Sequence, residues 1–371
     1  MKFWFGQKAA RPVARPLLHR GYAGAAAVGD WPRGYEAQVR DAYLGNPVAQ
    51  RAVRLVAECV AWAPVYVRDG TAAAAASARA LALATPPLLD SAAAQLLLHG
   101  NCFLQILADA DGMPAELFAL RPERVTIEAD PGGWPAAYVY RAGEVKTRLA
   151  ARDGLGRPAL VHVRAMHPLD DHYGLGCLGA AAGAVATHNA ATRWNKALLD
   201  NAARPSGALT LDGGDGVLAA EQYDRLRDEL ERHFAGAGNA GRPMLLEGGL
   251  KWQTMSLTPA DMDFVALKAA AAREIALAFG VPPMLLGLPG DSTYANYREA
   301  NRALWRLTVL PLADRLLGGI AAALGAWWPG LKLALDVDQV SALAEDRERL
   351  WAQVTAADFL TREEKREMLG F

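Results

Sequence analysis

Apolar residues that recur every three to four positions predict two helices in the first hundred residues. Asn46 followed by Pro47 indicates a helix start, because an N-cap residue precedes a proline suited to the first helical position. The side chains expected on the buried face of this helix are Val48, Ala52, Leu55, Val56 and Cys59. A strand at 64–70, an Ala-rich linker at 71–87 and a second helix at 90–99 are predicted to follow.

Between residues 101 and 165 the pattern changes from helical spacing to alternation. Four runs are rich in β-branched and aromatic residues and are separated by turns that contain Gly and Asp. The strands predicted from these runs occupy 102–112, 124–133, 136–144 and 159–164. Residues 40–165 are therefore expected to form an α+β domain.

Longer helices are predicted in the second half of the chain. The Ala-rich stretch from Ala180 is expected to stay helical as far as Pro205, and its small side chains indicate close contact with a neighbouring helix. A compact β-α-β-β insert comes next. Thr258 followed by Pro259 then indicates another helix start, and Gly280 ends that helix. The predicted core face of this helix consists of Phe264, Leu267, Ala271, Ile275 and Ala278.

The stretch 290–306, GDSTYANYREANRALWR, has an unusual pattern for a helix. Three residues that can cap an N-terminus come first: Asp291, Ser292 and Thr293. The residues that then recur at helical spacing are Tyr294, Tyr297, Asn301 and Leu304. A core helix would carry aliphatic residues on that face, and an exposed helix would carry lysine and glutamate. The helix is predicted to run to about Leu324, with a kink at Pro311, and a strand and two helices complete the chain.

Composition narrows the classes of function. The chain has 39 basic and 40 acidic residues and a net charge of −1, which argues against a protein that grips nucleic acid over a large surface. No apolar run reaches the length of about 18 residues that a membrane helix needs, so no membrane contact is expected. Three widely spaced cysteines predict neither a disulfide framework nor a zinc cage. The first 29 residues hold five basic and no acidic residues, which we interpret as a flexible arm within 1–39.

Catalytic motifs are scarce. The segment GAGNAG at 236–241 matches the dinucleotide fingerprint, but it follows a predicted helix and precedes a predicted strand, whereas phosphate binding needs a strand, a turn and a helix N-terminus. We interpret this segment as a glycine loop. The sequence contains no nucleophile elbow, zinc-binding helix or phosphate loop. The protein is therefore expected not to be an enzyme, with no catalytic residue, metal or cofactor.

One segment leaves an alternative open. HPLDDHYGLGC at 167–177 gathers the following possible metal ligands or acid-base groups: His167, Asp170, Asp171, His172 and Cys177. Asp170 and Asp171 are adjacent, so their side chains point to opposite sides of an extended chain. The favoured interpretation is a turn that enters the next helix, and a small metal-dependent enzyme that uses this cluster is the alternative.

Several segments together resemble the portal protein of long-tailed bacteriophages and related gene transfer agents. They are NPVAQRAVRLVAE, HPLDDHYGLG, HNAATRWNKALLDNAARPSGAL, NAGRPMLLEGGLKWQ and the stretch from AAAREIALAFGVPP to STYANYREANRALW. The resemblance spans about residues 40–370 in the same order. Departures are Ser292 where Asn is expected, the Ala-rich linker and the basic first 30 residues.

The resemblance implies an α+β portal fold. Its segments would be a basic arm at 1–39, a wing at 40–181, a first stem helix at 182–206, a clip at 207–258, a second stem helix at 259–280, a tunnel loop at 281–293, a long kinked helix at 294–330 and a wing or crown segment at 331–371. Portals form a ring, usually of twelve copies, at one capsid vertex, and double-stranded DNA passes through it. The implied location is thus a virion or phage-like particle that is assembled in the bacterial cytoplasm.

The resemblance also assigns candidate site residues. The tunnel loop and DNA channel would use Met284, Leu285, Leu286, Leu288, Asp291, Ser292, Thr293 and Tyr294. The prolines and glycines of this loop predict that it protrudes without a helical part and exposes its apolar side chains in a single subunit, and Asp291 is expected to cap the following helix. The clip would dock the terminase large subunit and later the head-tail adaptor protein through Arg225, Asp228, Glu229 and Arg232. The subunit interface would use Ala182, Ala186 and Ala190, and the major capsid protein would surround the ring.

Two questions about the tyrosine-bearing helix stay open at this point. Tyr294 and Tyr297 either face neighbouring subunits and the channel or only staple the loop to its own helix. A DNA-binding regulator is a further alternative for the whole chain, although the balanced charge argues against it.

Overall fold

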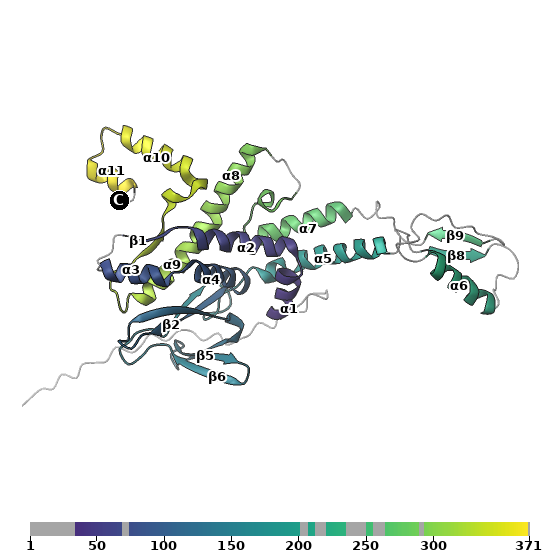
Figure 1. The fold of residues 1–371 in the computed structure, drawn as a ribbon, viewed down its shortest axis with the longest axis horizontal. Coiled ribbons are helices and arrows are strands. Elements are labelled where there is room, and N and C mark those ends of the chain that lie inside the picture. Colours follow the sequence, from purple (N-terminus) through teal and green to yellow (C-terminus); the bar gives the residue numbers. More distant parts are fainter. Residues whose placement is uncertain are drawn as a thin grey trace, which may run out of the picture. The chain divides into compact units, whose positions relative to one another are not determined.

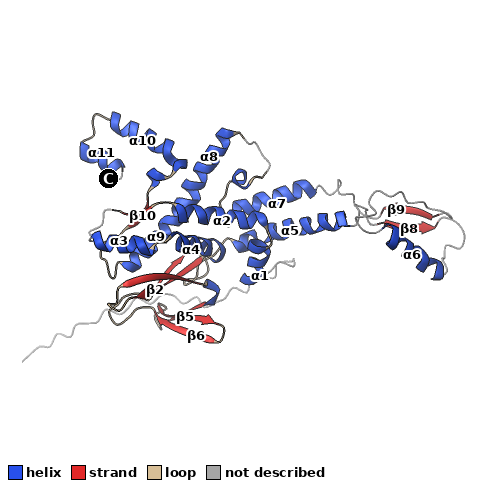
Figure 2. Cartoon of the chain, in the orientation of Figure 1, coloured by secondary structure: helices blue, strands red, loops and turns tan. Residues whose placement is uncertain are grey.

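The computed structural model describes residues 34–68, 74–200, 207–211, 220–234, 250–254, 264–288 and 293–369. The chain divides into two compact units. The first combines Met1–Ala182 with Ala276–Phe371, and the second comprises Gly183–Ile275. Both units contain helices together with antiparallel strands (Figure 1), and the secondary structure is marked in Figure 2.

The first helices of the first unit begin as the sequence predicts. A short α1 (Tyr35–Val39) runs into a π-helical turn at Arg40–Leu44, and α2 (Pro47–Trp62) follows. The side-chain oxygen of Asn46 accepts the backbone N–H groups of the second and third helical residues, both at 3.0 Å. These groups have no partner inside the helix, so the N-cap satisfies them.

Small side chains define the face through which α2 packs on α4 (Pro86–His99). The buried side chains of α2 are Ala49, Ala52, Val53, Val56, Ala57, Val60 and Ala61. The predicted face is right at Ala52 and Val56 but wrong at Val48, Leu55 and Cys59, which are half-buried. Because alanine allows close approach of two helices, the contact follows the alanines rather than the larger aliphatic residues.

The Ala-rich stretch that was predicted as a linker contains a helix, α3 (Ala74–Leu83). Alanine has the highest intrinsic helix propensity, so low complexity is compatible with helix here. The following helix, α4, begins at Pro86 rather than at Asp90. It ends at Gly100, which adopts a left-handed φ of 81° and donates its N–H to the Leu96 carbonyl.

Two three-stranded antiparallel sheets follow. The first has the order β3-β2-β7, with strands at Pro114–Leu120, Asn101–Ala108 and Leu160–Arg164. The second has the order β4-β5-β6, with strands at Val125–Ala129, Pro135–Ala142 and Val145–Ala150. The sequence analysis finds β2, β4, β5 and β7 but misses β3 and β6. Side chains of both sheets share one buried cluster: Phe103, Leu120, Val125, Tyr138 and Leu160.

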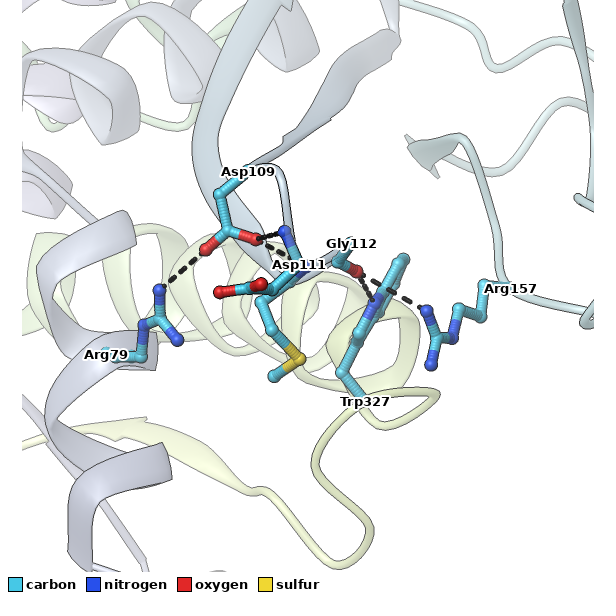
Figure 3. A network of polar contacts seen from close by, with 7 residues as sticks. Arg79, Asp109, Asp111, Gly112, Arg157 and Trp327 are labelled. Carbon is cyan, nitrogen blue, oxygen red and sulfur yellow. Dashed lines mark hydrogen bonds and ion pairs between the residues drawn. The ribbon is translucent and has the colours of Figure 1, made fainter.

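The turn between β2 and β3 is held by the carboxylate of Asp109 (Figure 3). One carboxylate oxygen accepts the backbone N–H groups of Asp111 and Met113 at 3.1 and 2.9 Å. The other oxygen pairs with Arg79 of α3 at 2.9 Å. The same side chain therefore closes the turn and connects it to α3.

A tryptophan connects this turn to the C-terminal half of the unit. The indole Nε1–H of Trp327 donates to the Gly112 carbonyl at 2.8 Å, and Arg157 donates to the same oxygen at 3.4 Å (Figure 3). The Arg157 guanidinium also lies 5.5 Å from the centroid of a ring of Trp327. Segments far apart in sequence thus meet at one carbonyl group.

One long helix runs from Tyr294 to Leu324. It consists of α8 (Tyr294–Leu304), a π-helical turn at Trp305–Val309 and α9 (Leu310–Leu324). In a regular α-helix the ring of Pro311 would clash with the carbonyl four residues earlier, and the wider π turn directly before the proline accommodates it. At the place where a kink is predicted, the structure thus has a π turn directly before Pro311.

By length and composition this helix could cross a membrane, which corrects the expectation that no segment could. Part of this helix, mostly α9, nevertheless contributes side chains to the core of the first unit. Six of them have no exposed surface: Val309, Ala313, Leu316, Leu317, Ile320 and Leu324. We interpret the helix as a core helix for this reason.

The chain after α9 returns to its N-terminal part. β10 (Leu333–Leu335) pairs antiparallel with β1 (Val65–Val67), and both strands match predicted ones. Two 3-10 turns at 337–343 lead to α10 (Ala344–Ala356), and α11 (Arg362–Leu369) packs against it.

The second unit contains most of two helices and a small sheet. α5 (Leu178–Asp200) and α7 (Phe264–Ala278) both extend into it, and β8 (Gly207–Leu211) pairs antiparallel with β9 (Leu250–Thr254). The helix of the insert is α6 (Ala220–Phe234). The second predicted strand of the insert, the glycine loop at 236–241 and the helix start at Thr258 lie outside the described residues.

The face of α7 is only partly as predicted. The helix and the residue after it bury Ala271, Ala272, Ile275, Ala276 and Phe279. Phe264 stacks on Trp194 of α5 with ring centroids 4.2 Å apart. Leu267, however, is exposed, so its assignment to the core is wrong. Val265 and Leu277 are also exposed, and α7 therefore has apolar side chains on more than one face.

A buried asparagine connects the first sheet to the segment at 167–177. Oδ1 of Asn101 accepts the Gly174 N–H at 2.7 Å, and Nδ2 donates to the Gly174 carbonyl at 3.1 Å. Nε2 of His162 lies 3.1 Å from this Oδ1, and Nδ1 of His99 lies 3.0 Å from Nδ2. Because an amide oxygen only accepts and an amide nitrogen only donates, His162 carries a proton on Nε2 and His99 accepts at Nδ1.

The ring of His162 stacks on Phe103, with centroids 4.3 Å apart. Burial, and after it the charge of the neighbouring Arg164, lower the pKa of His162 to about 3. A histidine held neutral in the folded state binds a proton more readily when the chain unfolds. Its contribution to stability is therefore complete above the unfolded pKa of about 6.5 and decreases as the pH falls from there towards 3.

We predict that the free energy of unfolding falls by up to about 2 kcal/mol between pH 7 and pH 5 because of His162 alone. His162→Gln keeps an N–H donor for Asn101 but cannot titrate, so this variant should lose that part of the pH dependence. Urea unfolding at a series of pH values, followed by tryptophan fluorescence, measures it. Equal slopes for the variant and the original chain would contradict the prediction.

Candidate channel and subunit-contact surfaces

The described part of the segment after α7 contains a helical turn. Pro283–Leu286 forms a 3-10 turn, which corrects the expectation that the tunnel loop has no helical part. The turn packs on α2 and α8. The apolar side chains assigned to the channel are half-buried in their own subunit: Met284, Leu285, Leu286 and Leu288. The expectation that they are exposed is therefore wrong, because this half of the loop is part of the fold.

One hydrogen bond holds the start of this segment, at Gly280, against the long helix. The hydroxyl of Thr308, within the π turn, donates to the Gly280 carbonyl at 2.6 Å. Gly280 has a left-handed φ of 65°, and a Cβ added there would lie 2.8 Å from the Thr308 Oγ1. Both the backbone angle and the close approach require glycine at this position.

The start of α8 bears on the question raised by its tyrosines. Thr293 is the N-cap, and its hydroxyl oxygen accepts the Asn296 N–H at 3.2 Å. Asp291, which was expected to cap the helix, lies outside the described residues together with Ser292. Tyr294 is 81% exposed and Tyr297 is 51% exposed. Within the described part of the subunit, the Tyr294 side chain is therefore mostly uncovered.

Charged residues of α8 connect it to α10. Arg298 and Arg302 donate to the two carboxylate oxygens of Glu345 at 2.7 and 2.9 Å, and Arg302 also pairs with Glu299. The Arg302 side chain is 12% exposed. This network attaches α10 to the helix that follows the loop, so the two helices are expected to move together.

The alanines assigned to a subunit interface lie on the less buried side of α5. The side chains that α5 buries are Leu178, Ala181, Ala184, Val185, His188 and Ala191. In contrast, Ala182 and Ala186 are half-buried and Ala190 is exposed. The fold of one subunit therefore does not bury this stripe completely.

The helix assigned to docking, α6, is highly charged and exposed. Arg225 and Glu229 are exposed, whereas Asp228 is half-buried and pairs with Arg227 at 3.4 Å. The side chain of Arg232 lies outside the described residues. Arg225 and Glu229 are thus the two docking candidates whose side chains the structure exposes.

The segment at 167–177 forms a tight turn. Oδ1 of Asp170 accepts the N–H groups of His172 and Tyr173 at 2.7 and 2.8 Å. Burial would raise the pKa of Asp170, but these backbone N–H groups and nearby histidines lower it overall. The hydroxyl of Tyr173 accepts the Ile127 N–H of β4 at 2.8 Å. The carboxylate is thus used to close the turn.

The glycines of this turn have a packing role. A Cβ on Gly174 would lie 2.0 Å from the Gly100 carbonyl oxygen, and one on Gly176 would lie 2.3 Å from the Leu98 carbonyl oxygen. Only glycine fits where the two backbones cross this closely. Among the described residues, no group of three or more His, Cys, Asp and Glu side chains could hold a metal ion. The interpretation of the segment as a turn is the one that the geometry supports.

Comparison with known proteins identifies the family. The model of the phage portal protein family matches residues 47–370, which is most of the chain. The chain belongs to the phage portal protein family. The resemblance, the α+β portal fold and the structural role as a portal protein of a phage-like particle are therefore confirmed.

Relatives of this portal protein include both sequences and solved structures. An uncharacterized protein of Rickettsia felis (strain ATCC VR-1525 / URRWXCal2) is 40% identical over 348 residues, which cover 89% of this chain and 88% of that protein. A chain of the virion of a native gene transfer agent particle is 47% identical with a TM-score of 0.69, and the match covers 92% of this chain and 94% of that chain.

The same identity, coverage and TM-score are found for the neck of the native gene transfer agent particle with C12 symmetry and for the neck of the empty particle with C6 symmetry. An HK97-family phage portal protein from Corynebacterium diphtheriae is 17% identical with a TM-score of 0.54, and the match covers 81% of this chain and 96% of that chain. This last likeness concerns the fold alone.

Two features of the portal surface are missed by sequence reasoning. The contact between Thr308 and Gly280 is one, although a threonine three residues before Pro311 is a possible signal for a side chain near the irregular turn. The pairing of Arg298 and Arg302 with Glu345 is the other, because residues more than forty positions apart carry no spacing pattern.

We predict that Gly280→Ala lowers the free energy of unfolding by about 2 kcal/mol. Roughly 1 kcal/mol arises from the left-handed backbone and the rest from the displaced Thr308 hydrogen bond. Gly287→Ala is the matched control, because Gly287 has a similar φ of 70° with no atom within 4 Å of its added Cβ. Chemical denaturation of both variants gives the difference, and equal losses would show that the Thr308 contact has no energetic role.

Proposed function

We propose that this portal protein assembles into a closed ring, with twelve copies in the assembled particle, at one vertex of a phage-like capsid, and that double-stranded DNA passes through the ring during packaging and ejection. The observation that carries the proposal is the 47% identity, over 92% of the chain, to a chain in the C12-symmetric neck of a gene transfer agent particle. Such a virion component would be assembled in the bacterial cytoplasm.

Exposed apolar side chains support ring formation. On α7, Val265 is 83% exposed and Leu277 is 78% exposed, and on α5 the stripe of Ala182, Ala186 and Ala190 is left incompletely buried. Apolar surface of this kind is unfavourable in water and is typical of an interface. We assign these two stem helices to contacts between neighbouring subunits.

The charge balance supports passage of DNA rather than tight binding. A channel dense in lysine and arginine would hold phosphate groups and slow translocation. The net charge of −1 avoids this, and Tyr294 and Tyr297 offer uncharged bulk and hydroxyl groups. Since the first half of the tunnel loop packs on its own subunit, we assign contact with DNA to the exposed start of α8, beginning at Thr293.

The clip is proposed to meet successive partners. Exposed charges such as Arg225 and Glu229 on α6 fit reversible docking, first of the terminase large subunit and then of the head-tail adaptor protein. The major capsid protein would surround the ring at the vertex. The role is structural, with no catalytic step and no cofactor assigned to this chain.

We predict that Ala186→Glu prevents ring formation, because it places a charge where neighbouring helices meet. An uncompensated buried charge costs roughly 3–5 kcal/mol. Ala180→Glu is the matched control, since Ala180 is exposed and lies about 120° away around the helix axis. Native mass spectrometry of the purified proteins counts the subunits.

The two possible failures of this experiment differ. If both the original chain and Ala186→Glu form rings, the alanine stripe does not belong to the interface, but the proposed function is unaffected. Absence of rings for the original chain, in solution and in assembled particles, would contradict the proposed function itself.

For the channel, we predict that the double substitution Tyr294→Ala and Tyr297→Ala changes the stability of the subunit by less than about 0.5 kcal/mol, since both side chains are exposed. Rings should form normally, while particles should retain shorter DNA. Replacement of both residues by Phe keeps their bulk and should preserve full-length DNA if steric contact is what matters. The length of DNA extracted from purified particles measures the effect, and full-length DNA in the Ala variant would exclude these residues from the channel.

A further inference from the structure

The most exposed large apolar side chain among the described residues belongs to Phe359, which is 86% exposed. It lies in the turn between α10 and α11 and directly follows Asp358, which is also exposed. At the tip of a helical hairpin, a phenyl ring this exposed offers a large apolar surface that a partner could bury. We call Asp358–Phe359 the knob. It presents a carboxylate next to a phenyl ring, and a partner surface that binds it would combine a positive charge with an apolar lining.

Hydrogen bonds hold the two ends of the turn that carries the knob. Thr361 and Glu364 form a capping box, in which Glu364 Oε2 accepts the Thr361 N–H at 2.8 Å and Thr361 Oγ1 accepts the Glu364 N–H at 3.3 Å. Lys365 on α11 donates to the Thr355 carbonyl at the end of α10 at 3.1 Å. A knob that is already held in place loses little conformational entropy when it binds.

A groove with complementary chemistry lies in the same unit. It has a volume of about 410 Å³ and lies between the long helix, the 3-10 turns at 337–343 and α10. Its aliphatic lining consists of Leu310, Val337, Leu343 and Leu350. Three arginines also line the groove: Arg306, Arg347 and Arg349. None of the eight lining residues is acidic.

The arginines differ in what they already bind. Arg347 pairs with the carboxylate of Asp338 and donates to the Leu369 carbonyl at 3.1 Å. Arg349 makes no ion pair within the described part of the chain and is exposed. The groove thus combines an apolar lining with an available positive charge, which matches an apolar residue next to a carboxylate.

The knob of the same chain does not fill this groove. The groove is lined by one face of α10, at Arg347, Leu350 and Gln353, whereas the knob lies beyond the C-terminal end of that helix. α11 packs back along α10, and the contacts of Lys365 and Arg347 hold it there (Figure 1). None of the turn residues 357–361 is among those that line the groove.

We propose that the Asp358–Phe359 knob of one subunit inserts into the groove at Leu310, Leu350 and Arg349 of a second copy of this chain. The inference rests on the proposed ring and adds a specific contact to it. Subunits in a cyclic ring meet through two different surfaces, so each subunit needs both a knob and a groove. Phe359 enters the aliphatic lining, and the carboxylate of Asp358 pairs with Arg349.

The first test removes the knob. Phe359→Ala should weaken association of subunits by about tenfold or more, as truncation of a buried aromatic anchor does at protein interfaces. Leu155→Ala is the control, because Leu155 is also highly exposed, at 75%, but lies between β6 and β7. Circular dichroism should show both variants folded, since neither side chain is buried. Analytical ultracentrifugation of rings over a dilution series measures the change.

The second test reverses the charges. Arg349→Asp and Asp358→Arg should each weaken the ring, and the double variant should recover most of the loss, because the pair is then restored with opposite polarity. Two weakened single variants without recovery in the double variant would exclude a direct pair.

The third test identifies the occupant. Subunits that carry Phe359→Cys are mixed with subunits that carry Gln353→Cys, and the mixture is oxidised. A two-chain product that forms in the mixture, but not from either variant alone, supports docking between copies. An internal disulfide in a chain that carries both changes, without any two-chain product, would show that the groove takes its own turn and would overturn the proposal.

Rings of normal affinity for Phe359→Ala, with no cross-link, would also overturn it and leave the groove for a different protein. Such a result would not affect the proposed function, because the rings themselves would still be present. Absence of rings for the original chain, in solution and in particles, would instead contradict the proposed function.

Discussion

The hydrogen bond from the Thr308 hydroxyl to the Gly280 carbonyl determines how the end of α7 meets the long helix. Gly280 terminates α7 in a left-handed conformation, and the chain then makes one 3-10 turn before the long helix begins. The hydrogen bond joins the end of α7 to the π turn of the long helix, and so connects the two ends of the segment 280–308. A side chain at 280 would occupy the space of the Thr308 hydroxyl. The same contact therefore requires glycine at 280 and a hydroxyl-bearing side chain at 308.

The π turn of the long helix explains why Thr308 is available for this contact. Pro311 cannot donate a backbone hydrogen bond and would clash in a regular helix, so the backbone widens at Trp305–Val309. The helix continues through α9, which supplies the core of the first unit, while α8 carries exposed tyrosines at its start. A single helix therefore joins a rigid core to a surface that we assign to the channel. Glu345 then attaches α10 to the same helix through Arg298 and Arg302.

Local chemistry with a clear mechanism could be predicted from the sequence. The N-cap at Asn46, the helix end at Gly100 and the irregularity before Pro311 each depend on residues next to one another, and all three are present. Features that depend on tertiary packing could not be predicted. The face of α2 follows small alanines that meet α4, and β6 is a short, mostly exposed strand whose place in the sheet depends on its pairing with β5.

The tunnel loop illustrates the same limit at the candidate site. Its prolines, glycines and leucines predicted a protruding loop, because composition alone does not reveal that α2 and α8 cover its first half. Of the residues assigned to the channel, Thr293 and Tyr294 are exposed at the start of α8, whereas residues 284–286 are half-buried. The family resemblance supplied the architecture, whereas the exposure of each side chain required the structure.

A ring-forming subunit must leave apolar surface exposed in the monomer, and this constraint connects the remaining features. Val265 and Leu277 on α7, Tyr294 on α8 and Phe359 after α10 are all highly exposed, although they lie far apart in the sequence. Each would be a liability in a protein that functions alone. The first two lie on a helix that we assign to subunit contacts, and the last lies on a turn for which the same unit offers a complementary groove.

Tyr294 differs from these side chains in its chemistry and its place. It carries a hydroxyl group and lies at the start of α8, next to the tunnel loop. A cyclic interface uses two unlike surfaces, and we propose that polarity distinguishes the exposed side chains that meet a neighbouring subunit from those that face the channel. Aliphatic and phenyl groups require a dry contact, whereas tyrosine hydroxyls remain hydrated beside passing phosphate groups without binding them as a cation would.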